Sequence, residues 1–219
     1  MVIVCGIDDA GKGPVIGPMI LAGVAVDEDN IPKLKSIGVK DSKLLTQKQR
    51  EKLCKEIIKI VKDYKIIKIY PEEIDKAVLS NSTNLNWLEG EKMAEIINSL
   101  KPDAVIVDCP SINKRAFSNF LLSKLKVNVN LQCEHKAERY PEVAAASILA
   151  KCAREEEVKL IKNKIGIDFG SGYMADPVTK EFLKNNWDKY PEIFRHSWAP
   201  YKEFSEGNKS KKQKKLGEY

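Results

Sequence analysis

The sequence predicts an α/β fold, with a mixed five-stranded sheet flanked by helices and a helical C-terminal segment. Three observations support this class. Apolar runs of strand length open the chain, and further such runs alternate with segments of helical periodicity after the first third. Residues 143–150 form a small-residue stretch within a helical pattern, which allows close packing of a helix on a sheet. A mixed sheet covered by helices accommodates all three.

The strands are expected, in chain order, at residues 2–7, 19–26, 66–69, 104–107 and 127–133. Helical spacing of apolar residues predicts helices at 43–64, 72–79, 84–100 and 111–125, and from 141 and 177 onward. Thr46 and Ser111 are candidate N-caps, while Pro141 and Pro177 suit the first turn of a helix. We expect one domain over residues 1–204, followed by a basic and flexible tail over 205–219.

The composition is that of a globular protein, with 43% hydrophobic and 31% charged residues in 219. No apolar run nears the roughly 20 residues that cross a bilayer, and no signal peptide opens the chain. We therefore expect a cytoplasmic protein without a membrane partner, and a monomer.

Cysteine and histidine usage excludes several chemistries. The five cysteines are an odd number without a Cys-x-x-Cys pair, which argues against a disulfide framework and a structural zinc site. We expect them to be reduced and mostly buried. With two histidines, no H-E-x-x-H and no G-x-S-x-G, neither a zinc hydrolase nor a serine nucleophile has support.

The positive charge is concentrated at the C-terminus. The chain carries a formal charge of +6, and residues 205–219 hold five lysines against two glutamates. A polyanionic partner would suit this tail, and a solvated end without a partner is the alternative.

The most informative stretch is Ile7–Pro18, where two carboxylates close a strand and a glycine-lysine-glycine loop follows. Asp8 and Asp9 could bind a hard cation, and the loop Gly11-Lys12-Gly13 lets backbone and ammonium approach phosphate. The stretch nearly spells a P-loop, but position 13 lacks the required hydroxyl and a strand follows instead of a helix. An ordinary turn at a strand end remains an alternative.

Two further acids could converge on this pair. Asp108 ends another predicted strand, and Glu138 lies just beyond the next one. Asp108 could instead be a helix-capping or turn residue. Four carboxylates in one cleft repel one another unless divalent cations neutralise them, and two cations about 4 Å apart can support attack at phosphorus.

With these residues in place, the chain resembles the type 2 ribonucleases H (the ribonuclease HII family), particularly their single-domain archaeal form. The resemblance extends from residue 1 to about residue 203. It is carried by Gly6–Pro18, Val39–Lys43, Val107–Pro110, Glu134–Pro141, Ala144–Lys151, Gly170–Tyr173, Asp176–Pro177 and Arg195–Trp198.

The resemblance implies a ribonuclease H-like fold and hydrolysis of RNA paired with DNA, including ribonucleotides embedded in duplex DNA. The implied cofactor is Mg²⁺ or Mn²⁺, and metal-activated water would leave a 3′-hydroxyl and a 5′-phosphate. By motif position, the metal ligands and catalytic residues would be Asp8, Asp9, Asp108 and Glu138.

The resemblance also implies the substrate contacts. The loop Gly11, Lys12 and Gly13 would contact the ribonucleotide 2′-hydroxyl and adjacent backbone, and Tyr173 would pack on the sugar at the RNA–DNA junction. Ser42 and Lys43 would contact DNA phosphate, with an ordinary surface lysine as the alternative for Lys43. Further candidates with a packing alternative are Ser147 for phosphate and Trp198, beside Arg195, for the nucleic-acid face.

The chain departs from the family pattern at three positions. Asp9 stands where the family usually has Glu, Glu138 where it usually has Asp, and Lys12 replaces a frequent Arg. One carboxylate arm is thus a methylene shorter and another longer, roughly 1.5 Å each. We expect an active enzyme whose metal preference leans toward Mn²⁺.

Two other functions stay open at this point. One is a different metal nuclease on the same fold, such as a junction resolvase or a transposase-like enzyme. The other is a non-catalytic module that binds hybrids. Whether the tail binds DNA or a sliding clamp is also open.

Overall fold

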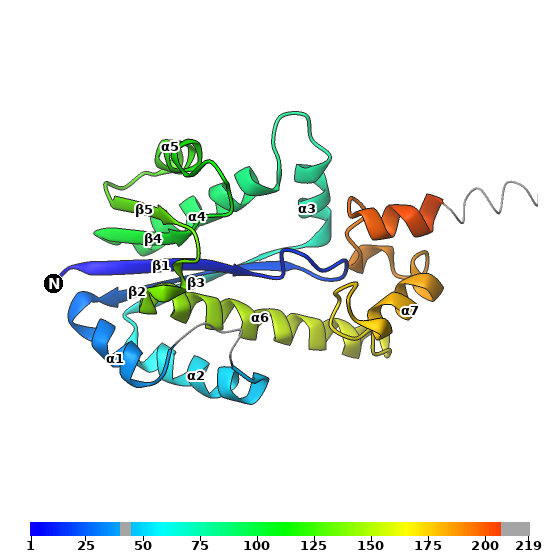
Figure 1. Ribbon diagram of the computed structural model, residues 1–219, viewed down its shortest axis with the longest axis horizontal. Helices are drawn as coiled ribbons and strands as arrows, with labels where there is room; N and C mark the ends of the chain where they lie inside the picture. The colour runs from blue at the N-terminus through cyan, green and yellow to red at the C-terminus, as the bar shows by residue number, and fades with distance from the viewer. Residues whose placement is uncertain (40–44, 207–219) are drawn as a thin grey trace, which may run out of the picture.

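A computed structural model describes residues 1–39 and 45–206 (Figure 1). Its centre is a five-stranded sheet with the strand order β3-β2-β1-β4-β5. The strands are β1 (Ile3–Ala10), β2 (Met19–Asp27), β3 (Asp63–Ile69), β4 (Ala104–Asp108) and β5 (Asn130–Glu134). The α/β class and the five strands are confirmed.

The sheet is mixed because β1 pairs in two directions. It runs antiparallel to β2 and parallel to β4, and β4 in turn runs parallel to β5. The carboxyl ends of β1, β4 and β5 therefore lie at one edge of the sheet, where side chains from distant parts of the sequence meet.

Helices cover both faces of the sheet (Figure 1). On one face lie α1 (Ile31–Ser36), α2 (Gln47–Ile60) and the long α6 (Pro141–Ile165). On the other face lie α4 (Leu85–Leu100) and α5 (Lys114–Lys124). A Cβ added at Gly6 of β1 would lie 2.2 Å from the backbone carbon of Glu142. Only glycine permits so close an approach of α6 to the sheet.

The C-terminal part of the chain forms a separate apolar cluster beyond the end of the sheet. It contains α7 (Pro177–Asn186), the 3₁₀ helix η4 (Pro191–Ile193) and a last helix over residues 199–206. The expected helical C-terminal segment is thus present, and its last helix continues two residues past the predicted boundary at 204. An isolated β-bridge between Ile16 and Phe194 ties it to the segment after β1.

Several boundaries differ from the sequence prediction. Asn113, not Ser111, caps α5, because its side chain accepts a hydrogen bond from the N–H of Ala116. The predicted first helix ends at Ile60, and Tyr64 belongs to β3. Thr46 does cap α2, in a reciprocal capping box with Gln49. The 3₁₀ helix η1 (Glu28–Asn30) and α1 were not predicted. The predicted helix at 72–79 is α3 (Pro71–Val78), which begins one residue earlier than expected.

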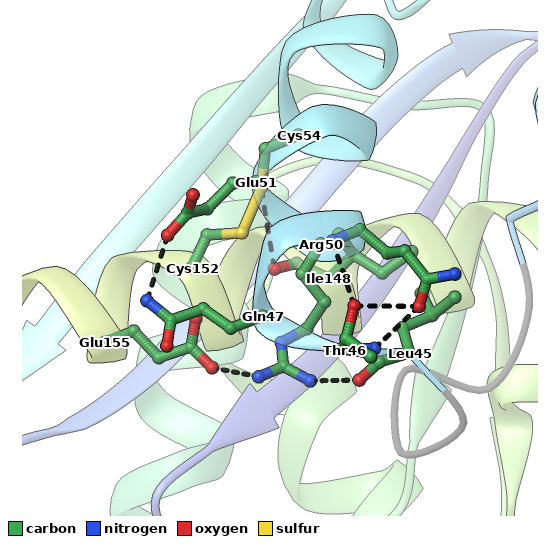
Figure 2. A network of polar contacts seen from close by, with 10 residues as sticks. Leu45, Thr46, Gln47, Arg50, Glu51, Cys54, Ile148, Cys152 and Glu155 are labelled. Atoms are coloured by element: carbon green, nitrogen blue, oxygen red, sulfur yellow. Dashed lines mark hydrogen bonds and ion pairs between the residues drawn. A yellow bond between two sulfur atoms is a disulfide. The ribbon is translucent and has the colours of Figure 1, made fainter.

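The prediction of reduced cysteines is wrong for one pair. A disulfide joins Cys54 of α2 to Cys152 of α6, whereas Cys5, Cys109 and Cys133 are free (Figure 2). The sequence separation of 98 residues gives no hint of this pairing, which arises from the packing of α2 on α6.

Polar contacts surround this disulfide (Figure 2). Arg50 donates to the carbonyl oxygen of Leu45 at 2.6 Å and forms an ion pair with Glu155 of α6. The amide of Gln47 donates to Glu51 at 2.9 Å. Of these contacts, the ion pair between Arg50 and Glu155 holds the first turns of α2 against α6.

In the described part of the chain, no helix combines the length and the apolar character needed to cross a membrane.

Candidate active site

The four predicted metal ligands come from the edge of the sheet where β1, β4 and β5 end. Ile7 is the parallel partner of Val107, so Asp8 and Asp108 follow on neighbouring strands. The Oδ1 atom of Asp108 accepts a hydrogen bond of 2.9 Å from the N–H of Ala137. This bond holds the 3₁₀ helix η3 (Ala137–Arg139), which carries Glu138, next to the end of β4.

Asp8 is buried on the α6 side of the sheet, with 4% of its surface exposed. Burial raises its pKa well above the usual value, and the negative charges of Asp9 and Asp108 raise it further. Hydrogen bonds from Ser147 of α6 and from the N–H of Asp9 act in the opposite direction. Ser147 is itself buried, and this contact makes it a support for Asp8.

Asp9 is the next residue of the strand and therefore points to the opposite face. Burial is the largest cause that raises its pKa, and Asp108 and Glu138 contribute in the same direction. The ammonium groups of Lys12 and Lys151 oppose this rise. The pKa of Asp9 is thus affected by two of the other candidate ligands and by two cationic side chains.

The donor set fits a hard divalent cation. All four candidates offer carboxylate oxygens, the ligands that Mg²⁺ and Mn²⁺ prefer, and a cation would relieve their burial and mutual repulsion. Across residues 1–39 and 45–206, no three His, Cys, Asp or Glu side chains are grouped so that they could hold a metal ion as they stand. The role of these four acids as ligands stays a prediction.

The loop after β1 lies beside these acids. Gly11 has a φ of +83°, and a Cβ there would lie 2.5 Å from the Cδ of Arg154, so the position favours glycine. The ammonium of Lys12 lies 2.7 Å from Oε1 of Glu89 and 3.1 Å from Oδ1 of Asn86, both on α4. The Lys12 side chain is thus directed toward α4.

Tyr173 lies next to this loop, although 160 residues separate them. A Cβ placed on Gly13 would be 3.6 Å from Cε1 of the Tyr173 ring. The guanidinium of Arg154 lies 4.8 Å from the ring centroid and donates to the carbonyl oxygen of Ser171 at 2.8 Å. Arg154 therefore connects the loop to the glycine-rich segment that carries Tyr173. Ser42 and Lys43 lie outside the described residues.

Sequence reasoning missed Glu89, a buried carboxylate of α4 with no exposed surface. Burial raises its pKa to about 7, and Asp9 and Asp108 contribute to the rise while Lys12 opposes it. A signal was available in the sequence. Glu89 stands in the row of apolar residues at a spacing of four that Leu85, Met93 and Ile97 form along the buried face of α4.

Sequence reasoning named Arg195 only as the neighbour of Trp198. The structure shows Arg195 fully buried and bonded to the loop after β1. Arg195 is therefore not part of an open nucleic-acid face. Trp198 is partly buried, and its indole N–H donates to the carbonyl oxygen of Gly13 at 3.2 Å. The packing alternative is the one that the structure favours for Trp198.

The sheet order, its covering helices and the acids at the ends of β1 and β4 define the ribonuclease H class of nucleases. The model of the family Ribonuclease HII matches residues 5–201. The chain belongs to the ribonuclease HII family, whose members act as ribonucleases H on RNA–DNA hybrids and depend on divalent metal.

Relatives and solved structures agree with this assignment. The chain is 45% identical over 213 residues to the ribonuclease HII of Pyrococcus furiosus, covering 94% of this chain and 93% of the relative. The crystal structure of ribonuclease H2 from Pyrococcus horikoshii OT3 superposes with a TM-score of 0.86 at 41% identity, covering 94% and 98%. A structure of the PCNA:RNase HII complex from Archaeoglobus fulgidus gives 0.78 at 44% identity, covering 88% and 91%.

Proposed function

We propose that this enzyme is an endonuclease that hydrolyses the RNA strand of hybrids and cuts 5′ of ribonucleotides embedded in duplex DNA. The products would be a 3′-hydroxyl and a 5′-phosphate. The observation that carries the proposal is the meeting of Asp8 and Asp108, on adjacent strand ends, with the loop Gly11–Gly13 and Tyr173. Phosphodiester chemistry and recognition of a sugar would then occur side by side.

Asp8, Asp9, Asp108 and Glu138 are the residues that would hold Mg²⁺ or Mn²⁺. A divalent cation bound there would activate a water for attack on phosphorus and stabilise the leaving oxygen. Ser147 supports this by fixing the orientation of Asp8 through its hydrogen bond. The bond from Ala137 to Asp108 does the same for the second strand end.

The loop and Tyr173 would choose the substrate. The 2′-hydroxyl distinguishes RNA from DNA, and the backbone of Gly11, Lys12 and Gly13 offers groups that can hydrogen-bond it. The partly exposed ring of Tyr173, stacked against Arg154, offers a flat apolar surface for the neighbouring sugar. Ser42 and Lys43 stay candidates for phosphate contacts, whereas the buried Ser147 is bonded to Asp8.

Cleavage mapping tests this function against its rivals. Three duplexes are compared in Mg²⁺ and in Mn²⁺: an RNA–DNA hybrid, duplex DNA with one ribonucleotide, and all-DNA. We expect cuts in the first two only, on the 5′ side of the embedded ribonucleotide. Cleavage of all-DNA or branched DNA would favour a different nuclease, and binding without cleavage in either metal would favour a hybrid-binding module.

We also propose that the enzyme acts as a monomer in the cytoplasm, in ribonucleotide excision and RNA primer removal, with the lysine-rich tail as a contact for a sliding clamp. The Archaeoglobus fulgidus relative was solved as a complex with PCNA, which supports the clamp contact. The test compares the full chain with a chain ending at Glu206 in binding to the PCNA of that relative and to duplex DNA. Loss of clamp binding alone supports the contact, whereas unchanged clamp binding contradicts it.

A further inference from the structure

The carbonyl oxygens of Gly11, Lys12 and Gly13, in the loop after β1, all accept hydrogen bonds from the C-terminal segment. Arg195 donates from Nη2 to the carbonyl of Gly11 at 2.6 Å, from Nη1 to that of Lys12 at 2.7 Å, and from Nε to that of Gly17 at 3.1 Å. The indole N–H of Trp198 reaches the carbonyl of Gly13. The guanidinium also lies 4.9 Å from the centroid of the Trp198 ring.

These bonds fix the direction of the loop's N–H groups. In a planar trans peptide unit, the C=O of one residue and the N–H of the next point in opposite directions. Because Arg195 draws the carbonyls of Gly11 and Lys12 toward the protein interior, the N–H groups of Lys12 and Gly13 are turned away from it. Within the described residues, neither of these two N–H groups donates a backbone hydrogen bond.

We propose that Arg195 is a positioning residue for substrate recognition, which orients two peptide units so that the N–H groups of Lys12 and Gly13 face the oxygen atoms of a ribonucleotide. The inference rests on the proposed function and assigns a role to a residue that touches no substrate itself. Adjacent N–H groups that point outward form a concave binding place for an oxygen atom.

The chemistry of arginine explains why this residue type is needed. A guanidinium is a planar fork of donors that can serve three carbonyls at once, whereas a lysine ammonium is a single point. A buried cation without such partners would be costly. Burial lowers the pKa of Arg195 to about 10, so the side chain is still protonated at neutral pH.

Two anchors hold Arg195 in place. Its own N–H donates to the carbonyl oxygen of Val15 at 2.9 Å. On the other side, the carboxylate of Asp75 in α3 accepts from the N–H groups of His196 at 2.8 Å and Ser197 at 2.9 Å. Through Asp75, the segment that carries Arg195 is thus anchored to α3 as well as to the loop.

The test measures how strongly the protein prefers a ribonucleotide. Dissociation constants are determined for duplex DNA with one ribonucleotide and for the same all-DNA duplex. An Asp108→Asn background allows divalent metal to be present without cleavage. Arg195→Lys and Trp198→Phe are compared with Leu183→Ala, which removes a fully buried side chain of the same C-terminal cluster and serves as the stability control.

We expect Arg195→Lys to reduce the preference for the ribonucleotide duplex by about tenfold, the equivalent of one strong hydrogen bond, while all-DNA binding changes little. Trp198→Phe, which loses a single hydrogen bond, should reduce the preference less, and it keeps the test valid if Arg195→Lys does not fold. Leu183→Ala should retain the preference at a similarly lowered Tm.

Retention of the wild-type preference in both variants would overturn the inference, as would an equal weakening of binding to both duplexes. Failure of the proposed function gives a different result. In that case the unaltered protein shows no preference for the ribonucleotide and cleaves neither hybrid nor embedded ribonucleotide.

Discussion

The ammonium of Lys12 lies 2.7 Å from Oε1 of Glu89, a carboxylate with no exposed surface. This pair places a fifth acid beside the candidate metal ligands, on the α4 side of the sheet that Asp9 also faces. Lys12 thereby has one carboxylate partner on α4 and lies close enough to Asp9 to influence it. The negative charge near Asp9 therefore comes from Glu89 of α4 as well as from the acids at the strand ends.

The first prediction concerns pH. Because the pKa of Glu89 is raised to about 7 from its ordinary 4.5, the folded protein binds this proton more tightly than the unfolded chain. Stability from this group is therefore fully present below about pH 4.5 and is lost as the pH rises through about 7. This loss of stability between low and high pH is on the order of 2 kcal/mol, or roughly 4–8 °C in Tm. We expect it to be absent in Glu89→Gln.

The measurement is Tm in EDTA at several values from pH 5 to pH 8, so that no metal contributes. Glu91→Gln is the matched control, because Glu91 lies on the same helix but is exposed. Its curve should follow that of the unaltered protein. Equal slopes for Glu89→Gln and the unaltered protein would show that Glu89 does not titrate in this range.

The second prediction compares the substitution of an aspartate at each end of β4. Asp108→Asn removes a candidate ligand at the carboxyl end, and we expect kcat to fall by at least about 100-fold in either metal. Asp103→Asn changes the same residue type at the other end, where Oδ2 accepts from the N–H of Ile3 at 2.7 Å. That variant should lose about 1 kcal/mol of stability and keep its activity.

Thermal shift gives a readout of the metal site that does not depend on activity. Mg²⁺ or Mn²⁺ should raise the Tm of the unaltered protein and of Asp103→Asn, because a ligand that binds the folded state stabilises it. It should raise that of Asp108→Asn less. An equal rise in all three proteins would remove Asp108 from the metal site.

The third prediction concerns the choice of metal. Asp9 is one methylene shorter, and Glu138 one longer, than the family's usual residues, which moves each carboxylate by roughly 1.5 Å. Errors of about 1 Å in placing reacting groups can cost about 100-fold in rate. We expect Asp9→Glu, Glu138→Asp and the double variant to shift the ratio of rates in Mn²⁺ and Mg²⁺ toward Mg²⁺. An unchanged ratio in all three would contradict this.

Local sequence signals predicted much of the fold and part of the site. The apolar runs of β1 and β2 are buried along nearly their whole length, so their pattern is visible without the structure. Asp8 and Asp108 were recognisable because each ends such a run. α1 was missed because six residues with a proline in the first turn give little helical periodicity.

Contacts between distant segments could not be predicted from local pattern. Arg195 meets the carbonyl of Gly11 across 184 residues, and nothing in the sequence around either residue indicates the other. Glu89 could be predicted in part. Its place in a row of apolar residues on the helix indicates burial, but only the fold shows that the buried carboxylate contacts Lys12.

The last prediction concerns the disulfide between Cys54 and Cys152, which ties α2 to α6 (Figure 2). A crosslink over 98 residues restricts the unfolded chain, and its removal should cost up to about 4 kcal/mol, or on the order of 10 °C in Tm. We expect Cys54→Ser without reductant to have the same Tm as the reduced unaltered protein. Reductant should leave the Tm of Cys54→Ser unchanged.

Thiol titration of the denatured chain provides the direct count: three free thiols before reduction and all five after it. Five thiols before reduction would show that the two cysteines are not linked in solution.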